Sequence, residues 1–432
     1  ANLVAGHRPT AKDVDRFVAG AVTGTGSSEQ VTAFLMAVAL EGLPRDTLLA
    51  LTLAYSAHDA EPQEIGKGGG HRFLDKHSTG GVGDKLTLMV LPLAAAAGAQ
   101  VRKLSGTSLG HCRGTIDKLS AIPGFQHVSD LDVMTDEVRR FGFSIGRTSP
   151  SFCAGDNLTY TLRNQCGTTQ VPDLIAASIM SKKLALAPAG LVLDIKVGDG
   201  GLFASAEEAR RTAAAMCAIA EGYDLPTQMF LTDMTSPLGH AVGGLVEVAE
   251  ALDVLSAPPD PAARLCALAL DMSVALVTLS GYTSTSVARD AVLAAWSNGA
   301  AHARLSDWLA HRKADLTAFH TQTSWAEVYA PQDGWITAMN ARAVGTVSAK
   351  YAGSASWSGD IRLDRVMGDR VARGDRIARI AVDPAQASAA TQAIVSAVTF
   401  GTQPVAARPP ILEVVQTTPP KQRTTLHADR AS

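Results

Sequence analysis

Two glycine-rich turns, separated by one apolar segment, constrain this chain more than any other feature. Both lie within residues 73–125, FLDKHSTGGVGDKLTLMVLPLAAAAGAQVRKLSGTSLGHCRGTIDKLSAIPGF. Adjacent glycines allow successive backbone N–H groups to converge on one point, and a helix that follows adds its positive N-terminal end. The stretch therefore predicts a place where an anion is held.

The side chains around the two turns suit an oxyanion. The first turn, Ser78–Asp84, has Lys76 before it and Thr87 after it. The second turn offers one lysine and several hydroxyls, namely Lys103, Ser105, Thr107, Ser108 and Thr115. Phosphate needs donors from several directions, which two facing loops provide. A structural turn before a helix fits the pattern as well. Neither turn is a Walker loop or a GxGxxG fingerprint, which disfavours a nucleoside triphosphate or a dinucleotide.

A second group of polar residues lies downstream of the turns. Ser178 and Lys182 are four apart on a predicted helix over residues 174–184, so they share a face. Pro172 separates Arg163 from that helix. The pattern alone favours two solvated lysines and a surface arginine over a binding site. Similarly, His77 is either a structural histidine or a group held rigidly beside the anion.

Hydrophobic patterning predicts a multi-domain α/β protein. At 432 residues the chain should form about two or three domains. Residues 10–57 read as three helices, the third capped by Asp46. From residue 72, apolar strands alternate with helices, which predicts a mixed, mostly parallel sheet that binds ligands at the carboxyl ends of its strands. Near residue 325 short β-like pieces begin, including Gly345–Ala352, and indicate a C-terminal α+β part.

We therefore divide the chain into four parts. A small helical domain comprises residues 1–60 and about 150–185. The α/β domain takes residues 61–149 and 186–324, and the C-terminal α+β domain takes residues 325–416. Residues 417–432 are polar and include two prolines, so we predict a disordered tail.

Composition argues against several classes of function. The net charge of −3 gives no general basic field for nucleic acid or an anionic membrane. The five cysteines are odd in number and form no CxxC pair, which favours a reduced protein without zinc. The first residues lack a signal-peptide layout, and the most apolar stretch, Leu86–Ala97, is too short to span a membrane. We expect a cytoplasmic protein.

Taken together, these residues resemble the pyrimidine and thymidine nucleoside phosphorylases. The resemblance begins with DKHSTGGVGD and SGTSLGHCRGTIDKLSAIPGF and continues through YTLR, ASIMSKKLA, DIKVGDG and TDMTSPLGHAVG. It implies reversible phosphorolysis, in which a pyrimidine nucleoside and phosphate give the free base and a pentose 1-phosphate. It also implies inorganic phosphate as co-substrate, no required cofactor, a homodimer formed through the helical domain, and closure between the domains that hold phosphate and base.

The resemblance assigns roles to individual residues. Its phosphate contacts match Lys76, Ser78, Thr87, Ser105 and Thr115. Its pyrimidine-holding groups match His77, Arg163, Ser178 and Lys182. As the glycosidic bond breaks, negative charge builds on the departing pyrimidine, and the cationic and imidazole groups of this second set would stabilise that charge. No nucleophilic side chain is needed.

The chain departs from the family pattern in the second turn and beyond it. Thr107 and Ser108 stand where the family has Arg-Gly, and Arg113 adds a charge that reaches a phosphate, reaches a modified 5′ end of the nucleoside, or points to solvent. Leu202 replaces a phenylalanine usual near the pyrimidine. We take four positions as candidates for specificity: Thr107, Leu109, Arg113 and Leu202.

Some members of the family bind potassium or another cation near a hinge. The matching positions here are Gly83, Lys85, Leu238, Ala241 and Glu250. Lys85 replaces a threonine, which suggests that its ammonium takes the place of the cation.

Two other functions stay open on sequence alone. The altered second turn would suit a nucleoside-binding homologue without activity. A phosphoribosyltransferase-like enzyme would need a pyrophosphate site and magnesium carboxylates, and the sequence offers no such acidic pair.

Overall fold

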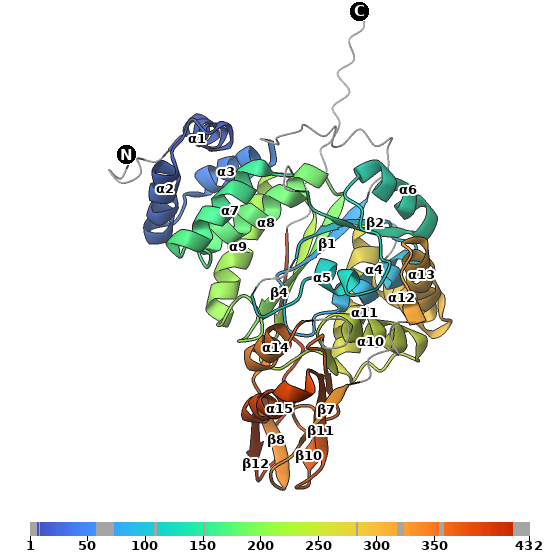
Figure 1. Cartoon of the computed structure of the whole chain (residues 1–432). Helices are drawn as coiled ribbons and strands as arrows, with labels where there is room; N and C mark the ends of the chain where they lie inside the picture. The colour runs from blue at the N-terminus through green and yellow to red at the C-terminus, as the bar shows by residue number, and fades with distance from the viewer. Residues whose placement is uncertain are drawn as a thin grey trace, which may run out of the picture.

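The computed structural model describes residues 7, 9–57, 73–107, 110–149, 152–281, 284–317, 324–353 and 358–417. These residues form a helical layer, a central α/β body and a smaller C-terminal part (Figure 1). The helical layer contains α1 (Ala11–Thr23), α2 (Ser28–Glu41), α3 (Arg45–Ala57), α7 (Ala154–Cys166) and α8 (Pro172–Leu186).

Capping residues explain where the first helices begin. Thr10 forms a capping box with Asp13 at the start of α1, and Ser27 caps α2 in the same way. The predicted cap of α3 is wrong, because that helix begins at Arg45 and Asp46 lies inside its first turn. There the carboxylate still favours the helix, since it faces the positive end of the helix dipole.

The central sheet has six strands in the order β13-β5-β4-β1-β2-β3. Strands β1 to β5 run parallel, and β13 lies antiparallel beside β5. The prediction of a mixed, mostly parallel sheet is therefore confirmed. The strands are β1 (Leu74–Ser78), β2 (Val101–Ser105), β3 (Phe143–Arg147), β4 (Gly190–Val197), β5 (Thr227–Asp233) and β13 (Ile411–Gln416).

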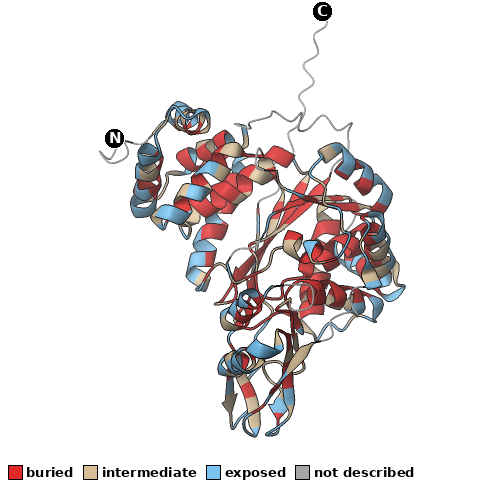
Figure 2. Ribbon diagram, viewed as in Figure 1, coloured by how far each residue is buried: buried red, intermediate tan, exposed pale blue. Residues whose placement is uncertain are grey.

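Buried residues lie on the strands of this sheet and on the helices that cover its two faces (Figure 2), and they form two apolar cores. On β4, Val192 joins the core on one face, while Leu191 and Leu193 join the core on the other, as the two-residue period of a strand requires. The first core contains helices α4 (Leu86–Ala96), α10 (Leu245–Ser256), α11 (Arg264–Leu279), α12 (Thr285–Ser297) and α13 (Ala300–His311). The second contains α9 (Ala206–Gly222) and the helical layer. A further helix, α6 (Leu131–Phe141), precedes β3.

Helix α4 is buried along its whole length, as its apolar sequence predicted. In the part of the chain that the structure describes, no helix combines the length and apolarity that crossing a bilayer requires.

The C-terminal part contains two small sheets. Their strand orders are β10-β8-β12 and β6-β9-β11-β7, and β6 (Ala241–Val242) comes from the central body. The other elements are β7 (Trp325–Tyr329), β8 (Gly334–Met339), α14 (Ala341–Lys350), β9 (Ile361–Leu363), β10 (Arg370–Val371), β11 (Arg376–Ala381), the 3₁₀ turn η2 (Pro384–Gln386), α15 (Ala387–Ser396) and β12 (Val398–Gly401).

Two sequence predictions in this region need correction. The segment Gly345–Ala352 is not β-like, because α14 occupies residues 341–350 behind an Asn340 cap and buries residues at helical spacing. Thr417 does not belong to a disordered tail, because its hydroxyl accepts a hydrogen bond from the Thr227 N–H at 2.9 Å. The remainder of the predicted tail, residues 418–432, lies outside the described residues.

Candidate active site

Both glycine turns lie at the carboxyl edge of the central sheet. The first joins β1 to α4, and the second joins β2 to α5 (Thr115–Ser120). Strands β1 and β2 are neighbours, with Leu74 opposite Val101. The two turns therefore begin side by side, at the edge where parallel sheets bind ligands.

The first turn, residues 78–84, is fixed by close backbone contacts. The Thr79 N–H donates to Asp194 O at 2.9 Å, and the Val82 N–H donates to Gly200 O at 3.1 Å. Gly83 has a φ of +76°, and a Cβ there would lie 2.5 Å from the Leu238 carbonyl oxygen. Only glycine allows this approach, so the turn is rigid before any ligand binds.

Lys76 lies fully buried beneath this turn. Its Nζ donates to Thr87 Oγ1 at 3.4 Å and lies 3.9 Å from Asp194 Oδ2. Lys196 Nζ lies 2.7 Å from the same carboxylate oxygen. Burial lowers the pKa of Lys76, and Asp84 and Asp194 act against that decrease. Asp84 also lies within electrostatic reach of both lysines, so two carboxylates balance their charges beneath the turn.

Asp84 is the last residue of the first turn, and its carboxylate bonds back to the first residue of the turn, Ser78. Ser78 Oγ donates to Asp84 Oδ2 at 2.5 Å and accepts from the Gly80 N–H at 3.1 Å. Burial acts to raise the pKa of Asp84, but Lys196, Lys76 and Lys118 together hold it well below its usual range. Asp84 was not among the predicted site residues, although its position at the end of the glycine turn indicates a place beside the bound anion.

Lys118 connects the first turn to the helix that follows the second. It comes from α5, donates to the Asp84 carbonyl oxygen at 2.5 Å, and pairs with Glu247 at 2.8 Å. Both side chains of this ion pair are about 2% exposed. The sequence analysis missed Lys118 and Glu247, which lie far apart in the chain.

His77 is half-buried at the end of β1, next to Lys76. Burial lowers its pKa well below the usual value, and the charges of Lys183, Lys103, Lys76 and Lys182 lower it further. The imidazole is therefore neutral at pH 7 and can donate one hydrogen bond and accept one. It also lies within electrostatic reach of lysines from both predicted subsites.

Lys103 is a further buried lysine of this edge, located on β2. Burial, and then the charge of Lys183, lower its pKa well below the usual value. Its hydroxyl neighbour Ser105 lies buried at the end of the same strand, and Thr115 is half-buried at the start of α5. The five predicted phosphate contacts thus belong to two adjacent strands and the helices after them.

The second turn contacts the C-terminal part. Arg113 Nη2 donates to Ser358 O at 2.6 Å, and Arg342 Nη1 lies 3.3 Å from His111 Nδ1. Cys112 Sγ donates to Gly200 O at 3.3 Å. The Arg113 guanidinium therefore binds backbone, an outcome that the sequence analysis did not consider.

The other candidate specificity positions differ in their surroundings. Thr107 is exposed, and Leu202 is half-buried against the core of the helical layer. Leu109 lies outside the described residues.

Two of the predicted pyrimidine-holding residues, Ser178 and Lys182, meet at one carboxylate, that of Asp156 on α7. Ser178 Oγ donates to Asp156 Oδ2 at 2.9 Å, and Lys182 Nζ donates to the same oxygen. The Arg163 guanidinium is 2% exposed and donates to the carbonyl oxygens of Thr168, Thr169 and Leu174. The structure thus joins Ser178 to Lys182 through Asp156, which was not among the predicted site residues, and Arg163 lies within electrostatic reach of the same carboxylate.

The candidate cation positions surround an ammonium group. Lys85 Nζ donates to Leu238 O at 2.8 Å, to Ala241 O at 3.0 Å and to Glu250 Oε2 at 2.5 Å. Within the described ranges, no group of three or more His, Cys, Asp or Glu side chains is arranged to hold a metal ion. All five cysteines are free thiols.

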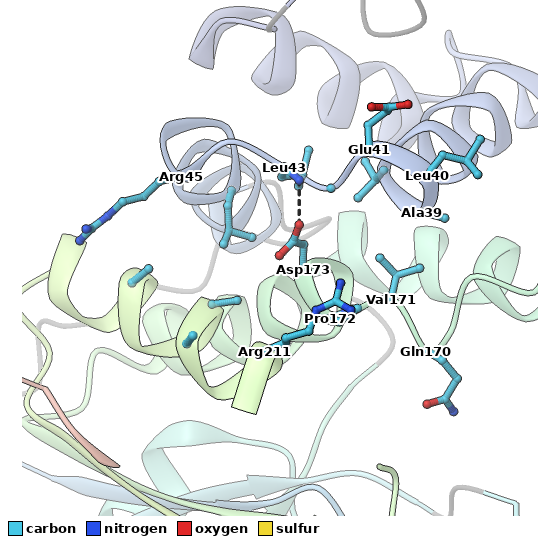
Figure 3. Close-up of a pocket in the computed structure, with 16 residues that line it drawn as sticks. Ala39, Leu40, Glu41, Leu43, Arg45, Gln170, Val171, Pro172, Asp173 and Arg211 are labelled. Carbon is cyan, nitrogen blue, oxygen red and sulfur yellow. Dashed lines mark hydrogen bonds between the residues drawn. The ribbon is translucent and has the colours of Figure 1, made fainter. Parts of the chain in front are cut away.

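A separate cavity of about 720 Å³ lies in the helical layer, between the α2–α3 junction, the start of α8 and α9 (Figure 3). Arg45, Asp173 and Arg211 line it, and Asp173 accepts a hydrogen bond from the Leu43 N–H at 2.7 Å. Its described lining includes none of the residues that we predicted for phosphate or base.

Comparison of this chain with known proteins shows the family to which it is similar. Residues 70–302 match the model of the glycosyl transferase family a/b domain. The thymidine phosphorylase of Burkholderia cenocepacia is 34% identical over 400 residues, which cover 88% of this chain and 91% of that protein. The human thymidine phosphorylase is 33% identical, over 96% of this chain and 91% of its own length. The pyrimidine-nucleoside phosphorylase of Geobacillus stearothermophilus is 30% identical, over 93% and 95%.

A solved structure shares the fold at lower identity. Anthranilate phosphoribosyltransferase from Thermus thermophilus superposes with a TM-score of 0.55 and 17% identity, over 72% of this chain and 98% of that one. This likeness supports the α/β architecture alone.

Proposed function

We propose that this chain, which belongs to the family of thymidine and pyrimidine-nucleoside phosphorylases, catalyses the reversible phosphorolysis of a pyrimidine nucleoside. Phosphate would attack C1′ of the sugar, and the base would leave as the glycosidic bond breaks. The observation that carries this proposal is the position of a buried, lysine-rich glycine turn beside His77, whose pKa responds to lysines of both subsites.

The phosphate would lie over the first turn, between strands β1 and β2. Lys76 and Thr87 are already in contact there, and the Ser78 hydroxyl, which donates to Asp84 in this structure, would turn its hydrogen to the phosphate. Ser105 and Thr115 would supply hydroxyl donors from the second strand and α5. Because most of these groups are held by the fold, the site needs little rearrangement to bind a tetrahedral anion.

The base would be held by His77, Arg163, Ser178 and Lys182. Of the two cationic residues, Lys182 is the more accessible, with a side chain 24% exposed, whereas Arg163 is buried. We infer that Lys182 donates directly to a carbonyl oxygen of the pyrimidine. The charge that builds on the leaving base would be stabilised by this ammonium and by the neutral imidazole of His77.

The test is release of free base from uridine, thymidine, 2′-deoxyuridine and 5′-modified uridines, with and without phosphate. Phosphate-dependent release from at least one nucleoside is expected, and Lys182→Ala should lose it by about 10²–10³-fold. Binding without release from any nucleoside would instead identify an inactive nucleoside-binding homologue. Release from uridine 5′-monophosphate that requires pyrophosphate and magnesium would identify a phosphoribosyltransferase-like enzyme.

We further propose that the enzyme requires no cofactor and no bound potassium. The Lys85 ammonium already donates hydrogen bonds to the two carbonyl oxygens and the carboxylate that would hold the cation. The activity should be equal in sodium and potassium buffers. Lys85→Thr removes the ammonium and should make activity depend on added potassium. Equal potassium dependence of the wild type and the variant would overturn this proposal.

Assembly, closure and location belong to the same proposal. Exposed Met36 and Leu40 on α2 and Leu53 on α3 support a homodimer formed through the helical layer, and light scattering of the purified protein would measure its mass.

We propose that the helical layer closes on the α/β body, which small-angle scattering with both substrates would detect. We also propose a cytoplasmic location.

A further inference from the structure

Asp156 lies at the centre of the proposed base subsite without touching the space where a base would bind. It is 1% exposed, so it sits beneath the side chains that it contacts. Its Oδ2 accepts from Ser178 Oγ at 2.9 Å and from Lys182 Nζ. Its Oδ1 is buried and has no hydrogen-bond partner among the described residues. A buried carboxylate with one oxygen unpaired costs stability, which makes a purely structural role a poor explanation.

The contact with Asp156 fixes the polarity of the Ser178 hydroxyl. An ionised carboxylate only accepts hydrogen bonds, so the single hydroxyl hydrogen of Ser178 points to Asp156. The lone pairs of Ser178 Oγ are then left for a ligand, which must bring a donor. The ammonium of Lys182 has three hydrogens, of which one is given to Asp156, and the partly exposed group keeps donors for a ligand.

This donor and acceptor pattern matches one class of pyrimidine. A pyrimidine-2,4-dione, such as uracil or thymine, presents carbonyl acceptors on either side of an N3–H donor. Cytosine presents an N3 acceptor and an N4 amino donor instead. Facing cytosine, the Ser178 lone pairs would meet the N3 lone pair, and a donor that faces O4 of the dione would meet the amino group. Such mismatches leave buried polar groups unpaired and are strongly discriminated against.

We propose that Asp156 is a positioning residue that sets base specificity, because it turns Ser178 into a hydrogen-bond acceptor and anchors Lys182 as a donor, so that the site takes pyrimidine-2,4-diones and rejects cytosine. This inference rests on the proposed phosphorolysis and on the placement of the base beside Ser178 and Lys182. No proton is transferred to or from Asp156, and no covalent bond to it forms.

The test compares the phosphorolysis of uridine and cytidine by the wild type and Asp156→Asn. An asparagine amide can donate to Ser178, which frees the hydroxyl hydrogen for a ligand, and it removes the counter-charge of Lys182. The uridine-to-cytidine ratio of kcat/KM should fall by about tenfold to a hundredfold. Calorimetric binding of free uracil and free cytosine should show the same fall in preference. A structural role would lower both activities equally and leave the ratio unchanged.

Two further variants keep the test decisive. Asp173→Asn is the matched control, since Asp173 lies in the same helical layer and its contact with Leu43 survives the change. It should leave the ratio unaltered. Ser178→Ala removes the acceptor while Asp156 and Lys182 stay paired, so it should lose the preference even if Asp156→Asn does not fold. An unchanged ratio in Ser178→Ala, or in folded Asp156→Asn, would overturn the inference. A wild type that releases no base would refute phosphorolysis itself and is therefore a distinct outcome.

Discussion

The two glycine turns occupy equivalent positions after neighbouring strands, yet they are built differently. The first, residues 78–84, rests on a fully buried lysine and is hydrogen-bonded to the residues at the ends of the neighbouring strands. The second, residues 106–114, includes exposed Thr107 and reaches the C-terminal part through Arg113 and His111.

The difference separates two tasks. Buried charges that pair with one another hold a turn in one geometry, which suits binding an anion that every turnover requires. Side chains that contact another domain change position when that domain moves, which suits adjustment of the substrate range. We therefore expect substitutions near the first turn to cost stability or turnover, and substitutions in the second turn to cost little.

Lys118→Met should produce the largest effect, because it leaves Glu247 buried without its ionic partner. The expected loss in free energy of unfolding at pH 7 is about 3–5 kcal/mol, measured by urea unfolding. Burial already raises the pKa of Glu247, and losing Lys118 raises it further. The loss should therefore shrink as the pH falls through that raised pKa, where the carboxyl is neutral. The double variant Lys118→Met, Glu247→Gln should recover most of the stability. A loss below about 1 kcal/mol in the single variant Lys118→Met would contradict the expectation.

Lys76→Met should act on turnover. The substitution keeps the apolar stem and removes the charge beneath the first turn, while Asp194 stays paired with Lys196. By analogy with other anion-stabilising donors, kcat/KM for phosphate should fall by about 10²–10³-fold. Circular dichroism serves as the control for folding. Unchanged phosphate kinetics would mean that the anion does not bind at this turn.

Arg113→Met removes a charge of the same sign from the second turn and is the matched comparison. It loses the hydrogen bond to Ser358 O, so a decrease in stability of about 1 kcal/mol is expected. Phosphate kinetics should change by less than about tenfold, since the guanidinium is bound to backbone in the structure. A drop as large as that of Lys76→Met would place Arg113 on the substrate and abolish the contrast between the turns.

The two histidines offer the most subtle comparison. Burial and four lysines lower the pKa of His77 strongly, whereas burial and Arg342 lower that of His111. As pH falls below the ordinary histidine range, the unfolded chain binds these protons first, so the folded state loses stability until its own pKa is reached. NMR titration, with His77→Gln for assignment, should find His77 neutral at a pH where His111 is already charged. The reverse order would contradict the crowding of lysines around His77.

Sequence predicted well the features that depend on local pattern. The capping box at Thr10, the uniformly apolar α4 and the position of both glycine turns follow from residues close together in the chain. The prediction of a β-like piece at Gly345–Ala352 failed, because an asparagine cap and tertiary packing select a helix there.

The candidate site was predictable in its residue types and less so in its connections. Lys118 with Glu247, and Asp156 with Ser178, join segments that only folding brings together. Arg113 could be singled out as an unusual charge, but its partner, Ser358, belongs to a part of the chain 245 residues away. Side chains that act through such partners have no local signature.

Strand β13 completes the central sheet from the far end of the chain. It pairs with β5 along residues 411–416, so the C-terminal part is inserted between two neighbouring strands of one sheet. During synthesis the ribosome must therefore release the chain as far as about residue 416 before the edge of β5 is covered. Until then that edge is an unprotected template for other strands. Loss of the last twenty or so described residues would leave the domains folded in outline but prone to aggregate, a hazard for any shortened form of this protein.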